Sequence, residues 1–269
     1  MTVDVRPTIE PRRVAAGIAI LVIAYATTLV AREALAGFAG VVLVLAYAEL
    51  RRLLVRHGSR VSLLLGAAAV GALVWIGSAG RPQDLVWVLV ALMLSLLAGR
   101  VVLAEVGRRD PRGATADVGG TIVAAGLVGA LGAHVLLVRA VPRFGAGGVV
   151  VFLSVVVAGT IAALLGDRFG RHGVADAAQR RTWEGIGAQI VAAAIVGLVA
   201  GVVADPPFGL VSGTLLGAGT GAVLAVGGLA GAALVRGGVS GRPGTVFRST
   251  SGPLLAAPAF YWAFRTLVL

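Results

Sequence analysis

Apolar residues run in nine long blocks along the chain, and short polar segments separate the blocks. The blocks cover residues 14–30, 34–50, 61–79, 84–104, 118–138, 147–166, 186–204, 210–234 and 253–268. A helix needs about 20 mostly apolar residues to cross the hydrocarbon core of a membrane. The pattern therefore predicts an all-α integral membrane protein with about nine transmembrane helices. We expect the last helix to be tilted or partly re-entrant, because Pro258 interrupts a short block.

The composition supports a membrane protein and excludes a soluble or disordered one. Hydrophobic residues make up 58% of the 269 residues, charged residues make up 13%, and the mean hydropathy is +0.96. A soluble domain carries about twice that share of charge, and a disordered chain is far less hydrophobic. We therefore treat residues 1–269 as one polytopic domain, with N-terminal spans within 14–138 and a C-terminal region over 147–269.

The arginines predict how the chain lies in the membrane. The chain has 23 arginines, no lysine and a net charge of +11. Counted from the N-terminus, alternate connections hold 18 arginines, whereas the opposite side holds five. Because positively charged loops stay in the cytoplasm, this split predicts a plasma-membrane protein with its N-terminus inside and its C-terminus outside. Nucleic-acid binding is excluded, since it needs a soluble basic face. Without cysteine, disulfides and thiolate metal sites are also excluded.

Two segments combine features that point to packing or to chemistry. Gly213, Gly217 and Gly221 recur every four residues, which favours close helix packing, with a groove for a lipid chain as the alternative. The connection after the sixth block reads GDRFGRHG over residues 166–173 and QRRTWEG over residues 179–185. Its guanidiniums match phosphate oxygens bidentately, and the alternative is a basic loop that touches anionic head groups.

Three local interactions follow from these spacings. We expect Thr182 to cap the seventh span, so that backbone N–H groups face an anion. We expect Asp167 to neutralise Arg171, four residues further along. Glu49 lies at the end of the second block, where we expect it to pair with loop arginines.

The connection resembles a segment of the phosphatidate cytidylyltransferases, or CDP-diacylglycerol synthases. FGRH at residues 169–172 and TWEG at residues 182–185 are similar to the family's two motifs in order and spacing. AYAEL at 46–50 and the tail at 256–267 resemble two weaker family segments. The resemblance implies a nine-span architecture and a set of nucleotide- or phosphate-binding residues: Arg171, His172, Arg181, Thr182, Arg236 and Arg248.

The family reaction converts CTP and phosphatidate into CDP-diacylglycerol and pyrophosphate, with Mg²⁺ or similar cations held by aspartates. Here the four aspartate positions of the resemblance fall at Gly159, Gly228, Phe247 and Thr250, none of which offers a side-chain carboxylate. The sequence therefore predicts no metal site at those positions. Three acids lie in the same connection, Asp167, Asp176 and Glu184, and any of them could rebuild a metal site. Asp167 and Glu184 are the remaining catalytic candidates.

Two hypotheses about function stay open. In the first, the protein is a divergent enzyme of phospholipid biosynthesis that uses CTP and Mg²⁺. In the second, it is a non-catalytic relative that binds anionic phospholipid or a membrane partner, a second copy of the chain included. A CTP-dependent polyprenol kinase and a transporter are more distant alternatives.

Overall fold

The computed structural model describes residues 11–56, 60–105, 114–174, 181–204, 206–237 and 245–268. A 3₁₀ turn, η1 (Pro82–Asp84), precedes α4, and a π-helical segment, η2 (Gly126–Ala130), joins α5 to α6. The α-helices are α1 (Pro11–Val30), α2 (Arg32–Arg56), α3 (Leu63–Ala79), α4 (Leu85–Glu105), α5 (Ala114–Ala125), α6 (Leu131–Arg139), α7 (Gly145–Phe169), α8 (Trp183–Val203), α9 (Leu210–Gly237) and α10 (Thr245–Leu267).

Every apolar block predicted from the sequence lies on a helix, and the chain is an all-α integral membrane protein. Within the described residues, six helical segments are long and apolar enough to cross a membrane: Arg32–Arg56, Pro82–Gly99, Asp117–Arg139, Gly145–Phe169, Trp183–Val203 and Leu210–Ala233. Two apolar helical segments, Ala19–Val30 and Leu63–Ala79, are shorter. The count of nine spans stays a prediction.

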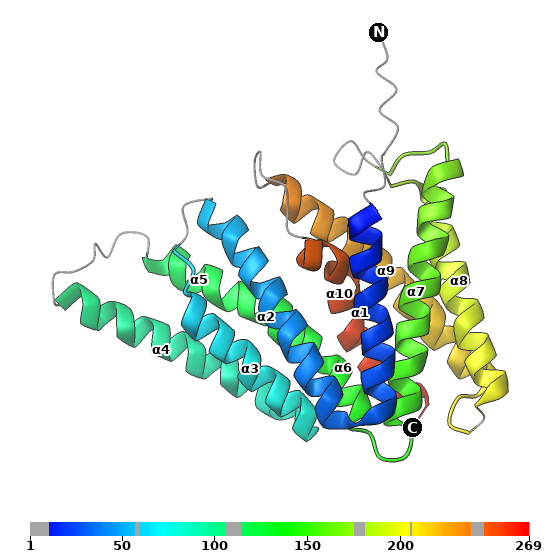
Figure 1. The fold of residues 1–269 in the computed structure, drawn as a ribbon, viewed down its shortest axis with the longest axis horizontal. Coiled ribbons are helices and arrows are strands. Elements are labelled where there is room, and N and C mark those ends of the chain that lie inside the picture. The colour runs from blue at the N-terminus through cyan, green and yellow to red at the C-terminus, as the bar shows by residue number, and fades with distance from the viewer. Residues whose placement is uncertain are drawn as a thin grey trace, which may run out of the picture.

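Successive helices run up and down through the bundle (Figure 1). Toward one end of it lie the start of α1, the end of α2, the end of α7, the start of α8 and the end of α9. The last turn of α10 lies at the opposite end. This arrangement gathers the connection with the candidate residues at the same end as the other arginine-rich helix ends, while the sidedness of the membrane stays a prediction.

Glycines let α8 lie directly against α9. A Cβ atom at Gly197 would collide with the backbone carbonyl of Gly213, and one at Gly217 would collide with the carbonyl of Ala193. Such close approach is typical of small residues between membrane helices. The ridge of glycines at spacing four therefore packs the helices, as predicted, and α7 also packs against α8.

Two helices extend furthest beyond their hydropathy blocks. α2 continues past the second block to Arg56, and α10 begins at Thr245, ahead of the last block. Backbone hydrogen bonds extend a helix into polar residues, whereas hydropathy only detects the apolar part. Pro253 and Pro258 both lie inside α10, which is a single helix. Its tilt or re-entry in the membrane stays a prediction.

Candidate functional site

The two described parts of the connection between α7 and α8 lie against each other. We call residues 166–174 with 181–185 the α7–α8 loop. Gly173 and Thr182 form an antiparallel bridge, and the N–H of Val174 donates to the carbonyl of Arg181 (3.0 Å). The N–H of Trp183 donates to the carbonyl of His172 (2.9 Å). The two family-like motifs therefore lie side by side, although nine residues separate them in sequence.

Asp167 closes this loop from the last turn of α7. Its Oδ1 accepts hydrogen bonds from the backbone N–H of Thr182 (2.8 Å) and from the Thr182 hydroxyl (3.2 Å). Its Oδ2 lies 3.4 Å from Nη1 of Arg181, and both side chains are largely buried. The expected pairing of Asp167 with Arg171 is wrong. The reversal of the chain brings Arg181 to this carboxylate instead.

Thr182 caps α8, as the sequence predicted. Its hydroxyl accepts a hydrogen bond from the N–H of Gly185 (3.0 Å), and its backbone is extended. Gly185 is needed at this point because a Cβ atom there would collide with the carboxylate of Asp167. Asp167, Thr182 and Gly185 thus pack together and fix the backbone at the start of α8.

Glu184 is bonded to the other half of the loop. Its two oxygens accept the backbone N–H groups of Arg171 (3.2 Å) and His172 (3.3 Å), and Oε1 lies 2.6 Å from Nδ1 of His172. The carboxylate therefore orients the imidazole and leaves its Nε2 as the ring nitrogen available to a ligand. The histidine side chain is 79% exposed, so this pair lies at the surface of the loop.

Arg181 connects the loop to α9. A Cβ atom built at Gly228 would lie 2.9 Å from Nη2 of Arg181, so the guanidinium lies beside a helix backbone that has no side chain. This position is one of the four that the resemblance assigned to aspartate. A cationic group occupies the space beside it.

The other three aspartate positions are also without carboxylates and have different surroundings. Gly159 of α7 faces the side chain of Gln189, which is buried and whose Oε1 has no hydrogen-bond partner among the described residues. Phe247 is buried in α10. The hydroxyl of Thr250 donates to the carbonyls of its own helix at 2.8 and 3.3 Å.

Glu49 has a different partner from the one expected. Its Oε2 accepts the backbone N–H of Phe247 (2.7 Å), 198 residues away, instead of meeting loop arginines. A carboxylate at this point satisfies an N–H in the first turn of α10 and complements the positive end of that helix. Neither this role nor the buried amide of Gln189 has a local signal in the sequence.

The predicted phosphate-binding residues come together in part. Arg171, His172, Arg181 and Thr182 all lie in the α7–α8 loop, and Arg171 is exposed. The side chains of Arg236 and Arg248 lie outside the described residues. Their expected convergence with the loop therefore stays a prediction.

Asp167 and Glu184, the two acids of the α7–α8 loop, do not fit a divalent cation, and Asp176 lies outside the described residues. Such a cation takes several oxygen ligands, but the oxygens of Asp167 and Glu184 are already occupied by N–H, O–H and guanidinium donors. In the part of the chain that the structure describes, no group of three His, Cys, Asp or Glu residues could hold a metal ion. No catalytic step through a metal ion follows from this geometry.

An apolar cavity adjoins the loop. Its volume is about 380 Å³, and among the described residues that line it Glu184 alone is charged. Phe169, which is 76% exposed, forms one wall next to the start of the loop. An apolar cavity beside exposed arginine suits a ligand with a charged head and a hydrocarbon body.

The comparisons with known proteins agree with the resemblance in the sequence. The model of the cytidylyltransferase family matches residues 11–237 of the chain. A search of curated proteins found no significant match. The matched range contains α1 to α9 and therefore the whole α7–α8 loop.

Proposed function

The chain belongs to the cytidylyltransferase family, and on this premise we propose that it binds the phosphate group of an anionic membrane phospholipid at the α7–α8 loop without metal-dependent nucleotidyl transfer. The proposal rests on the hydrogen bonds that the two acids of the loop, Asp167 and Glu184, already make. Both carboxylates accept hydrogen bonds from other parts of the loop, and these bonds hold the loop together.

Nucleotidyl transfer depends on positioning and on neutralising the charge of the reacting phosphates. A metal ion held by carboxylates would do both. Releasing Asp167 to a metal ion would leave the N–H of Thr182 without its acceptor and Arg181 without its carboxylate. The loop itself thus opposes the use of this acid as a ligand.

Phosphate binding needs no such release. Among the described residues, the guanidinium of Arg171 has no carboxylate partner. The guanidinium of Arg181 lies beside Gly228, which has no side chain. The backbone of the loop, fixed by Asp167 and Glu184, holds the two arginines in place. The phosphate would meet these cations while a hydrocarbon chain lies in the cavity beside Phe169.

The competing function is that of a divergent enzyme that takes CTP, phosphatidate and Mg²⁺. Family membership favours it, and the pair of His172 and Glu184 is the one arrangement in the loop suited to proton transfer. Such an enzyme would require a metal site assembled from residues other than Asp167 and Glu184.

The test is the amount of phosphatidate that the purified full-length protein retains after detergent exchange. Arg171→Gln should weaken retention about fivefold, because each basic residue near an anionic lipid contributes about 1 kcal/mol. Arg168→Gln is the matched control, since Arg168 is a neighbouring exposed arginine on α7. Equal retention by the wild type and both variants would overturn the proposal.

A further inference from the structure

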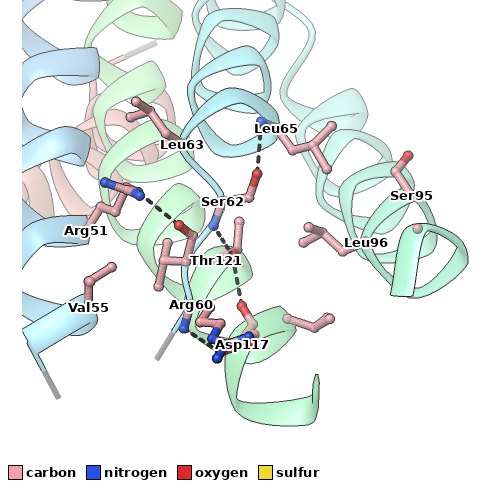
Figure 2. Close-up of a pocket in the computed structure, with 13 residues that line it drawn as sticks. Arg51, Val55, Arg60, Ser62, Leu63, Leu65, Ser95, Leu96, Asp117 and Thr121 are labelled. Atoms are coloured by element: carbon pink, nitrogen blue, oxygen red, sulfur yellow. Dashed lines mark hydrogen bonds between the residues drawn. The ribbon is translucent and has the colours of Figure 1, made fainter. Parts of the chain in front are cut away.

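A second cavity lies between α2, α3, α4 and α5, and it shares no residue with the α7–α8 loop. Its volume is about 370 Å³, within the range of about 300–1,000 Å³ typical of small-molecule sites. Figure 2 shows its polar side, where Arg51 of α2, Ser62 of the segment before α3 and Thr121 of α5 lie close together. The polar residues of the lining are Arg51, Arg60, Ser62, Ser95, Asp117 and Thr121.

Hydrogen bonds fix the polar side of this cavity. Nε of Arg51 donates to the carbonyl of Val61 (2.9 Å), and the N–H of Ser62 donates to the hydroxyl of Thr121 (3.1 Å). The backbone N–H of Arg60 donates to Oδ1 of Asp117. The segment before α3 is therefore held to α2 on one side and to α5 on the other, as Figure 2 shows.

The charge of the lining favours an anion. Among the described residues, the lining contains two arginines and one carboxylate, and that carboxylate, from Asp117, is 7% exposed and already accepts the backbone N–H of Arg60. Because Arg51 uses only Nε for its bond to Val61, its terminal N–H groups remain for oxygen atoms of a ligand. A guanidinium presents these donors in a planar fork that matches a phosphate group.

The rest of the lining is apolar and reaches deeper along the bundle. Val55, Leu65 and Leu96 line it, and the first two are more than 40% exposed. Ser95 lies ten residues before the end of α4, or about 15 Å along the helix at 1.5 Å per residue. Arg51, in contrast, lies near the end of α2. The cavity thus has a charged end at the helix termini and an apolar wall that extends toward the middle of the bundle.

We propose that this cavity, the α2–α5 cavity, binds an anionic phospholipid, with its phosphate at Arg51 and Arg60 and its hydrocarbon along Leu65 and Leu96. A free phosphate compound would satisfy the arginines but would leave the apolar wall uncovered. The phosphate of a lipid that already lies in the bilayer satisfies both. This site is independent of the function proposed for the α7–α8 loop.

The experiment uses the absence of native cysteine. Ser95→Cys places a thiol in the cavity wall, and Leu94→Cys places one on the same helix, exposed but outside the lining. Each full-length variant is placed in nanodiscs of phosphatidylcholine, with or without phosphatidylglycerol, and the rate of alkylation by uncharged N-ethylmaleimide is measured. We expect phosphatidylglycerol to slow the reaction at position 95 about fivefold and to leave position 94 unchanged. Soluble glycerol phosphate, added to phosphatidylcholine nanodiscs, should protect neither position.

Arginine variants in the Ser95→Cys background assign the effect to the cavity. Arg60→Gln keeps the backbone N–H that bonds to Asp117, so it should fold normally and lose most of the protection. Arg52→Gln removes an adjacent exposed arginine outside the lining and should keep the protection. Equal alkylation rates with and without phosphatidylglycerol would overturn the proposal. So would protection that survives Arg60→Gln, or protection by glycerol phosphate equal to that by the lipid.

Discussion

Replacing Asp167 by alanine should open the α7–α8 loop. The substitution removes the acceptor for the backbone N–H and hydroxyl of Thr182, and it removes the carboxylate that faces Arg181. No other described side chain is within hydrogen-bond distance of that N–H to replace it. The loop would then depend on Glu184 and on the bridge between its two halves.

The contacts give the size of the effect. A hydrogen bond to a charged acceptor contributes about 1.5–3 kcal/mol, and the N–H of Thr182 makes such a bond at 2.8 Å. The ion pair with Arg181 adds about 0.5–1 kcal/mol, because its 3.4 Å separation and the 27% exposure of the arginine weaken it. Together these interactions amount to about 2–4 kcal/mol, or roughly 30-fold to several-hundred-fold in the opening equilibrium.

Hydrogen exchange of the loop amides measures this opening directly. The amides of Val174 and Trp183, which bond across the loop, should exchange faster in Asp167→Ala by that factor. Asp84→Ala is the control, because Asp84 lies in η1, between α3 and α4, and should leave these amides unchanged. Exchange at Val174 and Trp183 within twofold of the wild type would refute the reasoning. It would show that Asp167 is available for another role, such as holding a cation.

Three further substitutions test the packing, the helix cap and the topology. Gly197→Ala should destabilise the protein by about 1–3 kcal/mol, since its Cβ atom would meet the backbone of α9, while Gly187→Ala, which meets open space, should leave the apparent Tm unchanged or higher. Glu49→Ala should cost about 1–3 kcal/mol, because the N–H of Phe247 loses its acceptor; an apparent Tm equal to that of the wild type would contradict this role. Asp110→Cys should react with an impermeant maleimide only from the cytoplasmic side, and labelling from outside would reverse the predicted orientation.

Most of the fold could be predicted from hydropathy. Each apolar block lies on a helix because a span buries its backbone polar groups only by forming one. Hydropathy places the ends of the helices less accurately, as at Arg56 and Thr245, since helical hydrogen bonds continue where apolar residues stop. The glycine ridge was predictable as well, because small residues at spacing four have one dominant use between membrane helices.

The α7–α8 loop could be singled out from the sequence, but its contacts could be predicted only in part. The cap formed by Thr182 follows from local sequence and is confirmed. The expected partner of Asp167 is wrong because α7 ends at Phe169, so that helical spacing does not extend to Arg171. The bond between Glu49 and Phe247 joins segments 198 residues apart, which no spacing rule can anticipate.

Turnover is the measurement that tests the central claim most directly. Purified full-length protein would be incubated with labelled CTP, phosphatidate and Mg²⁺ and scored for labelled CDP-diacylglycerol. Losing electrostatic stabilisation of the transition state at a single point typically costs about 2.7–4 kcal/mol, or roughly 100- to 1,000-fold in rate. With Gly159, Gly228, Phe247 and Thr250 at the expected ligand positions, we predict no product above the protein-free background. Mg²⁺-dependent product formation that disappears in Asp167→Asn would contradict the proposal and identify a divergent cytidylyltransferase.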